Sequence, residues 1–209
     1  MKLDRKKILS IFTLFLFSGS IIGLAANVFL NPTTNTTSTM TDTVVMETSK
    51  GTIEIELNKA KAPITVANFE DYVNSGFYDG LCFHRVIQGF MIQGGGFYPN
   101  STYRAPNNPI QIESNNGLKN TKGTIAMARS SDPNSATSQF FINTVDNLGL
   151  DYPNPDGYGY TVFGTVTSGM DVVTAISGVS TDTRETPYGS MDNWPIEPVV
   201  IIRAYMKTN

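Results

Sequence analysis

Residues 83–95 read FHRVIQGFMIQGG, and the interpretation of the whole chain depends on this stretch. Its one charged residue, Arg85, stands among apolar neighbours, which by itself is typical of a surface arginine whose stem lies along apolar side chains. Phe90 and Met91 alone would be interpreted as core residues. No lysine followed by Ser or Thr comes after the glycines of Gly94–Gly96, so we expect backbone that turns tightly and not a phosphate-binding loop.

Short strand-like runs separated by Gly, Asn and Pro surround this stretch on both sides. Val44–Glu47 and Thr52–Leu57 alternate on either side of Ser49-Lys50-Gly51, which predicts a hairpin. Further strands are predicted at Leu81–Ile87, Thr124–Ala128, Gln139–Asn143, Tyr160–Val166 and Val199–Tyr205. The region between Gly178 and Val199, which contains the only tryptophan, Trp194, is interpreted as a loop.

Only two helices are predicted. Pro63 begins one that runs to about Ser75 before Gly76, and the second covers Met170–Ser177 before another glycine. Many short strands with two helices predict a mainly β fold, a closed β-barrel with helical lids.

Two further segments are informative together with residues 83–95. Residues 123–128 read GTIAMA, and residues 138–143 read SQFFIN. In this order and at this spacing, the segments resemble the signature segments of cyclophilins, and Val162-Phe163-Gly164 resembles that family's late strand. The resemblance extends from about Thr43 to Ala204.

This resemblance implies a closed eight-stranded antiparallel β-barrel capped by two α-helices. It implies the activity of a peptidyl-prolyl cis/trans isomerase that needs no metal and no cofactor. The stretch from Pro109 to Arg129 is most similar to the bacterial and archaeal branch of the family. One alternative is a proline-binding chaperone or interaction module with little turnover, but that protein would be free to lose Arg85. Another is a structural barrel whose catalytic fold serves only protein contacts.

Carried over position by position, the resemblance assigns catalytic roles to Arg85, Gln93 and Phe141. It assigns substrate contacts to a further set: Phe90, Met91, Ala128, Arg129, Gln139, Leu150 and Tyr160. For Arg129, the expected contact is made by the backbone, which would hold the residues that precede proline.

The reaction explains why these residue types suit it. Resonance gives the peptide bond a rotational barrier of roughly 18–20 kcal/mol, whereas the two isomers before proline differ by only about 0.5–1 kcal/mol. A catalyst must therefore stabilise the twisted amide, in which the proline nitrogen regains its lone pair. The fixed donors of Arg85 can bind that nitrogen or the adjacent carbonyl, and this interaction strengthens as the bond twists.

The chain departs from the family pattern between Val145 and Tyr160, a segment that looks longer than usual. Tyr160 stands where many cyclophilins have histidine, and Gly149 or Leu148 stands where many have tryptophan. Because that tryptophan is missing, we expect weak cyclosporin binding.

Composition excludes several other classes. The net charge is -3, and basic residues cluster before Ile8, so the remaining chain is acidic and has no electrostatic reason to bind nucleic acid. One cysteine, Cys82, cannot form an intrachain disulfide or a cysteine-rich zinc site. Cys82 and His84 would share one strand face, but no cysteine-hydrolase motif surrounds them, and we interpret His84 as structural.

The N-terminal sequence predicts export. Residues 1–30, basic and then apolar, are expected to form a signal peptide or a membrane anchor. Residues 31–42 are expected to be a Thr-rich flexible linker, and residues 43–209 are expected to form the isomerase domain. The basic end would stay in the cytoplasm, which places the domain outside it. We expect a monomer whose partners are unfolded or exported polypeptides that contain proline.

Overall fold

The computed structural model of the chain describes residues 40–208. The strands are Met40–Thr48 (β1), Gly51–Leu57 (β2), Arg85–Ile87 (β3), Met91–Gly94 (β4), Thr124–Met127 (β5), Phe140–Asn143 (β6), Val162–Ser168 (β7), Thr181–Thr186 (β8), Gly189–Pro195 (β9) and Ile201–Thr208 (β10). The helices are Pro63–Asn74 (α1) and Met170–Ser177 (α2), with one 3-10 turn at Leu148–Leu150 (η1). Both predicted helices are confirmed.

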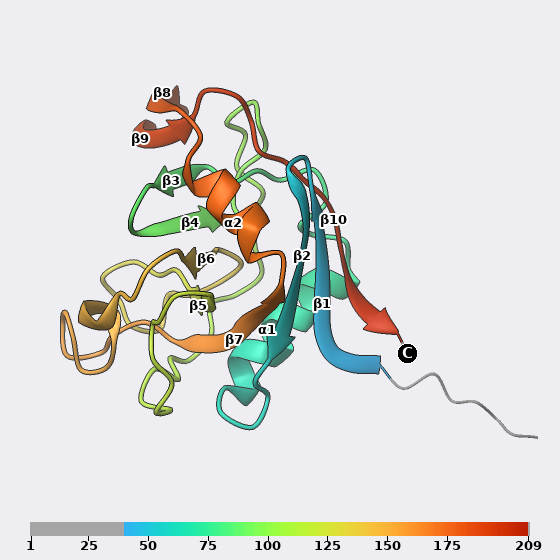
Figure 1. Cartoon of the computed structure of the whole chain (residues 1–209). Helices are drawn as coiled ribbons and strands as arrows, with labels where there is room; N and C mark the ends of the chain where they lie inside the picture. The colour runs from blue at the N-terminus through green and yellow to red at the C-terminus, as the bar shows by residue number, and fades with distance from the viewer. Residues whose placement is uncertain (1–39, 209) are drawn as a thin grey trace, which may run out of the picture. The chain divides into compact units, whose positions relative to one another are not determined.

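Eight strands form one antiparallel sheet in the order β10-β1-β2-β7-β5-β6-β4-β3, which curls into a barrel (Figure 1). Its two edge strands, β3 and β10, share no ladder; an isolated bridge between Cys82 and Val200, which precede these strands, crosses the gap between them. The predicted eight-stranded barrel is confirmed, but it is less completely closed than expected, because an isolated bridge satisfies far fewer backbone groups than a ladder.

Aromatic side chains from α1 and several strands fill the barrel interior. The Phe69 ring of α1 lies 5.6 Å from that of Phe140 on β6 and 5.1 Å from that of Phe163 on β7, between ring centroids. All three rings are fully buried. Pairs at these separations add specific contacts to the hydrophobic gain from burial, so this cluster fixes α1 against the sheet.

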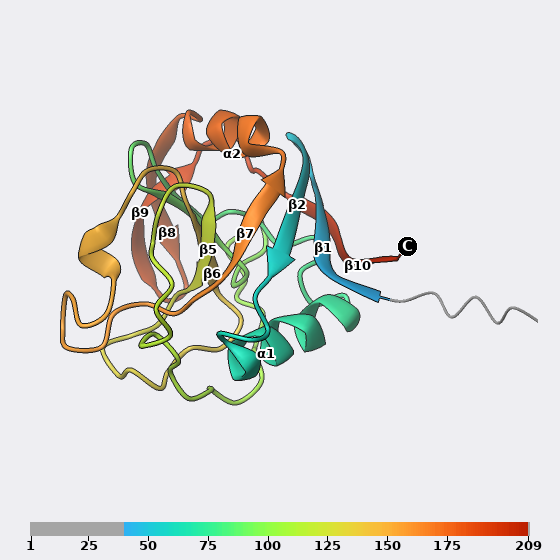
Figure 2. The ribbon, with the colours of Figure 1, turned by 60° about the horizontal axis from the view of Figure 1, so that its bottom comes forward.

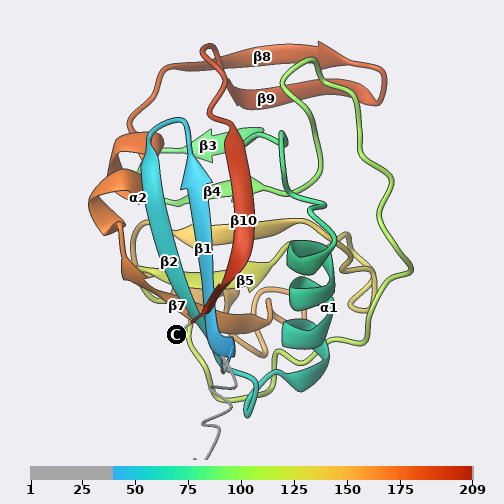
Figure 3. The same cartoon turned by 90° about the vertical axis from the view of Figure 1, so that its right-hand side faces the viewer.

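The two helices lie on opposite sides of the barrel (Figures 2 and 3). Pro63 begins α1, where its missing N–H costs no helical hydrogen bond. The Glu113 carboxylate accepts hydrogen bonds from the backbone N–H groups of Ile64 and Thr65 at 3.1 and 2.8 Å. A negative charge at this end also suits the helix dipole, so a residue distant in sequence caps α1.

A second apolar cluster covers the outer face of β4, β5 and β6. Met91, Ala126, Phe141 and Val162 are its buried members, and side chains from the surrounding loops pack against them. Neighbouring residues on a strand point to opposite faces, so Ile125 and Ile142 enter the interior while Ala126 and Phe141 face outward. The sheet is therefore buried on both faces at this point.

The region between Gly178 and Val199, interpreted from sequence as a loop, contains the two-stranded hairpin β8–β9. The hairpin lies beside β3 at one end of the barrel (Figure 3). Trp194 of this hairpin packs in a small buried cluster with Cys82 and Phe97. The predicted loop is thus wrong, and the hairpin covers one edge of the sheet.

The predicted leader, residues 1–30, lies outside the described residues, as does the linker up to residue 39. Strand β1 begins at Met40, slightly before the expected domain start at Thr43. Within residues 40–208, no helix is both long and apolar enough to cross a membrane.

Candidate active site

The central residues of the candidate site form one row across adjacent strands. Arg85 of β3 is paired with Gln93 of β4, Gln93 with Phe141 of β6, and Phe141 with Ala126 of β5. Directly paired residues in antiparallel strands project to the same face of the sheet. Strand register therefore brings together, on the outer face, residues that lie far apart in the sequence.

A cavity of about 130 Å³, here called the proline slot, opens on this face. Nine of the residues predicted from sequence line it: Arg85, Phe90, Met91, Gln93, Ala128, Arg129, Phe141, Leu150 and Tyr160. Phe141 and Met91 are almost fully buried and form its floor. The tenth predicted residue, Gln139, is absent from the lining but contacts Gln93. The site thus has an apolar floor and three lining residues with charged or amide side chains, Arg85, Gln93 and Arg129.

The guanidinium of Arg85 has no hydrogen bond or ion pair to any other residue in the described part of the chain. Its donors are therefore free for a ligand in the slot. The neighbouring amide is already oriented, since Gln93 Nε2 donates to Gln139 Oε1 at 2.9 Å. One side of the slot thus offers a permanent cation with unused donors beside a fixed amide.

The far side of the proline slot consists of Leu150 and Tyr160. The Tyr160 ring meets that of Phe141 edge-on, with centroids 5.8 Å apart. The Tyr160 N–H donates to the Leu150 carbonyl at 2.9 Å, which closes the base of the long segment between them. Tyr160 thus supplies an aromatic wall at the position where the sequence departs from the family pattern.

The contribution of the Arg129 side chain was not predicted from the sequence. Its guanidinium carbon lies 4.6 Å from the centroid of the Tyr160 ring and its Nη2 is paired with Asp156. This ion pair joins residues from separate loops, and no local sequence signal links them.

Cys82 and His84 are both fully buried, in contact with the cluster that contains Phe97 and Trp194. Burial raises the pKa of the Cys82 thiol to about 12 and lowers the pKa of the His84 imidazole to about 4. The Cys82 backbone and Gln139 partly oppose the shift at His84, but no residue among 40–208 hydrogen-bonds either ring nitrogen with good geometry. A neutral thiol without access to solvent is a poor nucleophile, which disfavours hydrolase chemistry.

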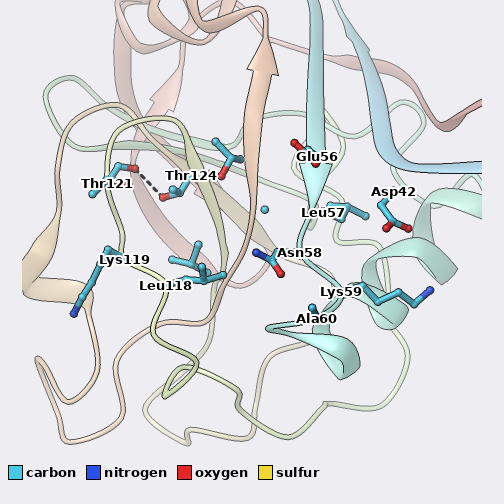
Figure 4. Close-up of a pocket in the computed structure, with 13 residues that line it drawn as sticks. Asp42, Glu56, Leu57, Asn58, Lys59, Ala60, Leu118, Lys119, Thr121 and Thr124 are labelled. Carbon is cyan, nitrogen blue, oxygen red and sulfur yellow. Dashed lines mark hydrogen bonds between the residues drawn. The ribbon is translucent and has the colours of Figure 1, made fainter.

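A larger cavity of about 530 Å³ lies between β2, β7 and the loop at Leu118–Thr121 (Figure 4). Asp42, Glu56 and Lys59 are among its lining residues, which include neither an arginine nor an aromatic ring. A twisted prolyl amide needs a fixed donor beside an apolar surface, so size alone does not make this cavity the active site. Within residues 40–208, no group of His, Cys, Asp and Glu could hold a metal ion.

An antiparallel barrel that carries a free arginine beside an apolar slot on its outer face defines a cyclophilin-type protein. The family model of the cyclophilin type peptidyl-prolyl cis-trans isomerase matches residues 43–206. The chain is 55% identical to the isomerase cyp18 of Streptomyces antibioticus and 51% identical to isomerase B of Escherichia coli; each match covers 76% of this chain and 95% of the relative.

A solved structure supports the same assignment. The cyclophilin type isomerase of Cryptosporidium parvum, crystallised in the presence of the dipeptide Ala-Pro, matches with a TM-score of 0.65 and 25% identity over 80% of this chain and 99% of that one. The chain belongs to the cyclophilin family and is a peptidyl-prolyl cis-trans isomerase.

Proposed function

We propose that this isomerase accelerates rotation about X-Pro bonds in exported polypeptides, with Arg85 as the residue that stabilises the twisted amide. The observation that carries the proposal is the unpaired Arg85 guanidinium at the edge of an apolar slot. The proline ring of the substrate would lie on Phe141 and Met91. The slot has about the volume of one small residue, which suits a single prolyl ring.

Differential binding accounts for the acceleration. The planar amide has little electron density on the proline nitrogen, whereas the twisted amide has a lone pair there. A donor from Arg85 therefore binds the twisted state more strongly than either planar isomer, which lowers the barrier. The oriented amide of Gln93 would hold the substrate backbone while the slot keeps the ring still.

Substrates that contain proline follow from this geometry and from the relative crystallised with Ala-Pro. The extracytoplasmic location rests on a separate feature, the basic and then apolar N-terminal sequence of residues 1–30. We propose that this segment directs the domain across the membrane as a signal peptide or retains it there as an anchor.

Isomerisation of a proline-containing tetrapeptide tests the proposed role of Arg85. The soluble body of the chain should accelerate the reaction, and Arg85→Ala should lower kcat/KM by about 100-fold, the order found when one transition-state donor is removed. Arg203→Ala is the matched control, because Arg203 lies on β10 and is absent from the slot lining.

Two results would count against the proposal. Full activity of Arg85→Ala would refute the mechanism while leaving the reaction intact. An inactive wild type that still binds the peptide would favour the alternative of a proline-binding chaperone. Mass measurement of the N-terminus in membrane and soluble fractions would distinguish a retained anchor from a cleaved signal, and detection of the protein in the cytoplasm alone would refute export.

A further inference from the structure

We propose that Arg129 is a positioning residue whose side-chain ion pair with Asp156 holds the 151–159 loop and, through it, the Tyr160 wall of the proline slot. This inference rests on the proposed function of the slot. It assigns Arg129 a role through its side chain, in addition to the backbone contact that the family resemblance implies.

Almost every donor of the Arg129 guanidinium is used. Nη2 donates to the two carboxylate oxygens of Asp156 at 2.7 and 2.9 Å. Nε and Nη2 donate to the Gly159 carbonyl at 3.0 and 2.8 Å, and Nη1 donates to the Ser130 carbonyl at 2.9 Å. The Arg129 side chain is only 3% exposed. A buried guanidinium that binds three separate groups is fixed in direction, unlike a typical surface arginine.

Asp156 organises its own loop as well as binding Arg129. Its Oδ1 accepts hydrogen bonds from the backbone N–H groups of Tyr158 and Gly159 at 3.1 and 3.3 Å. The Arg129 guanidinium and these amides hold the pKa of the Asp156 carboxyl below its usual value. The carboxylate therefore stays charged at neutral pH and links the loop backbone to Arg129.

The ion pair acts on the slot through Tyr160. One side of the Tyr160 ring faces the Arg129 guanidinium, at 4.6 Å, and its edge contact with Phe141 places it against the slot floor. Gly159, directly before Tyr160, has a φ of 68° and leaves no room for a Cβ beside the Tyr152 backbone. The loop therefore approaches its own start closely, and movement of Asp156 would shift Tyr160 with it.

A second set of hydrogen bonds holds the beginning of the same segment independently of Arg129. Asp151 Oδ1 accepts from the Asn120 backbone N–H at 2.7 Å, and Asn120 Oδ1 accepts from Asn143 Nδ2 at 3.2 Å. Asn143 in turn lies on β6. Leu150 should therefore remain in place when the Arg129 ion pair is lost, so that only the Tyr160 side of the slot loosens.

The test is steady-state isomerisation of the proline tetrapeptide by Arg129→Met and Asp156→Asn. Loss of the Tyr160 wall weakens contact with planar and twisted substrate alike. KM should therefore rise about tenfold, which corresponds to about 1.4 kcal/mol of binding energy, while kcat stays within about twofold. The double variant should be no worse than Arg129→Met, since both changes remove the same link. Arg129→Lys should lie between the wild type and Arg129→Met.

Arg203 offers a control of the same chemistry elsewhere. Its guanidinium carbon lies 4.3 Å from the Tyr205 ring centroid and its Nη2 bonds Glu47 at 3.0 Å, away from the slot. Arg203→Met and Glu47→Gln should leave KM unchanged. Chymotrypsin gives a second readout, because Tyr158 is 48% exposed and is followed by glycine: cleavage after Tyr158 should be faster in the Arg129 and Asp156 variants only.

The outcomes separate this inference from the proposed function. A wild type without activity would overturn the proposed function. An active wild type with an unchanged KM in Asp156→Asn would overturn the positioning role alone, and that variant alters a carboxylate that is 39% exposed, so it should fold. A fall in kcat at constant KM would also overturn it, because Arg129 would then act on the transition state.

Discussion

Gln93 Nε2 donates to Gln139 Oε1 at 2.9 Å, and the side chain of Gln139 lies directly over Gly96. The contact joins β4 to the segment that precedes β6, next to the Arg85 side of the proline slot. It fixes which way the Gln93 amide points, since an amide that donates through Nε2 must present its oxygen elsewhere. The orientation of one candidate catalytic residue therefore depends on a neighbour outside the slot lining.

Replacement of Gln139 by leucine should lower kcat/KM about tenfold. The Gln93 amide would lose its acceptor and would sample several orientations, of which only some suit the substrate backbone. Leucine has a similar size, so the fold should be retained. Gln139→Glu keeps the acceptor oxygen and should retain most activity; equal losses in both variants would show that the hydrogen bond is unimportant.

Gly96→Ala should reduce activity through the same contact. A Cβ at this position would lie 2.9 Å from Cδ and Nε2 of Gln139, which forces that side chain away from Gln93. We expect a loss similar to that of Gln139→Leu. Gly149→Ala is a suitable control, since no atom lies within 4 Å of a Cβ built there. Full activity of Gly96→Ala would mean that Gln139 can move without affecting catalysis.

Cyclosporin should inhibit this enzyme only weakly. By the family resemblance, Gly149 or Leu148 stands at the position of the usual tryptophan; both lie in η1, and Leu148 is 55% exposed. Neither can supply a large ring with a hydrogen-bond donor beside the slot. Titration of the isomerase assay with cyclosporin should give half-inhibition well above the nanomolar range; inhibition at nanomolar drug would refute this.

Much of the fold could be predicted from the sequence because local sequence features indicate its helices and strands. Proline at the start of α1, glycine after it and the alternation of β2 each reflect a short-range physical preference. The β8–β9 hairpin lacks such a signal: the side chains of β8 are polar and largely exposed, so no apolar alternation predicts a strand. The incomplete closure between β3 and β10 depends on long-range pairing, so it could not be predicted from the sequence either.

The residues of the candidate site likewise include some that the sequence predicts and some that it does not. Arg85 and Phe141 could be selected from sequence because they stand in long signature segments, and strand register then brings them to one face of the sheet. The side-chain role of Arg129 could not be predicted, because its partner Asp156 stands in an irregular loop where neither periodicity nor spacing indicates a contact. Capping of α1 by Glu113 was missed for the same reason.

His84 is the chain's one histidine, and it should make stability depend on pH. Its pKa is lowered from the ordinary 6.5 to about 4, chiefly because burial disfavours the charged ring. The unfolded chain therefore takes up a proton as pH falls below 6.5, whereas the folded protein does so only near pH 4. Stability is highest above pH 6.5 and falls as the pH drops towards 4.

Between pH 7.5 and pH 5, the free energy of unfolding should fall by about 2 kcal/mol, since each unit of pKa difference is worth about 1.36 kcal/mol. Urea unfolding followed by the fluorescence of Trp194 measures this directly, because the single tryptophan is buried with its ring 5.9 Å from that of His84. His84→Gln removes the titrating ring and should lack the part of the dependence that His84 causes. Equal slopes in wild type and variant would place the titrating group elsewhere.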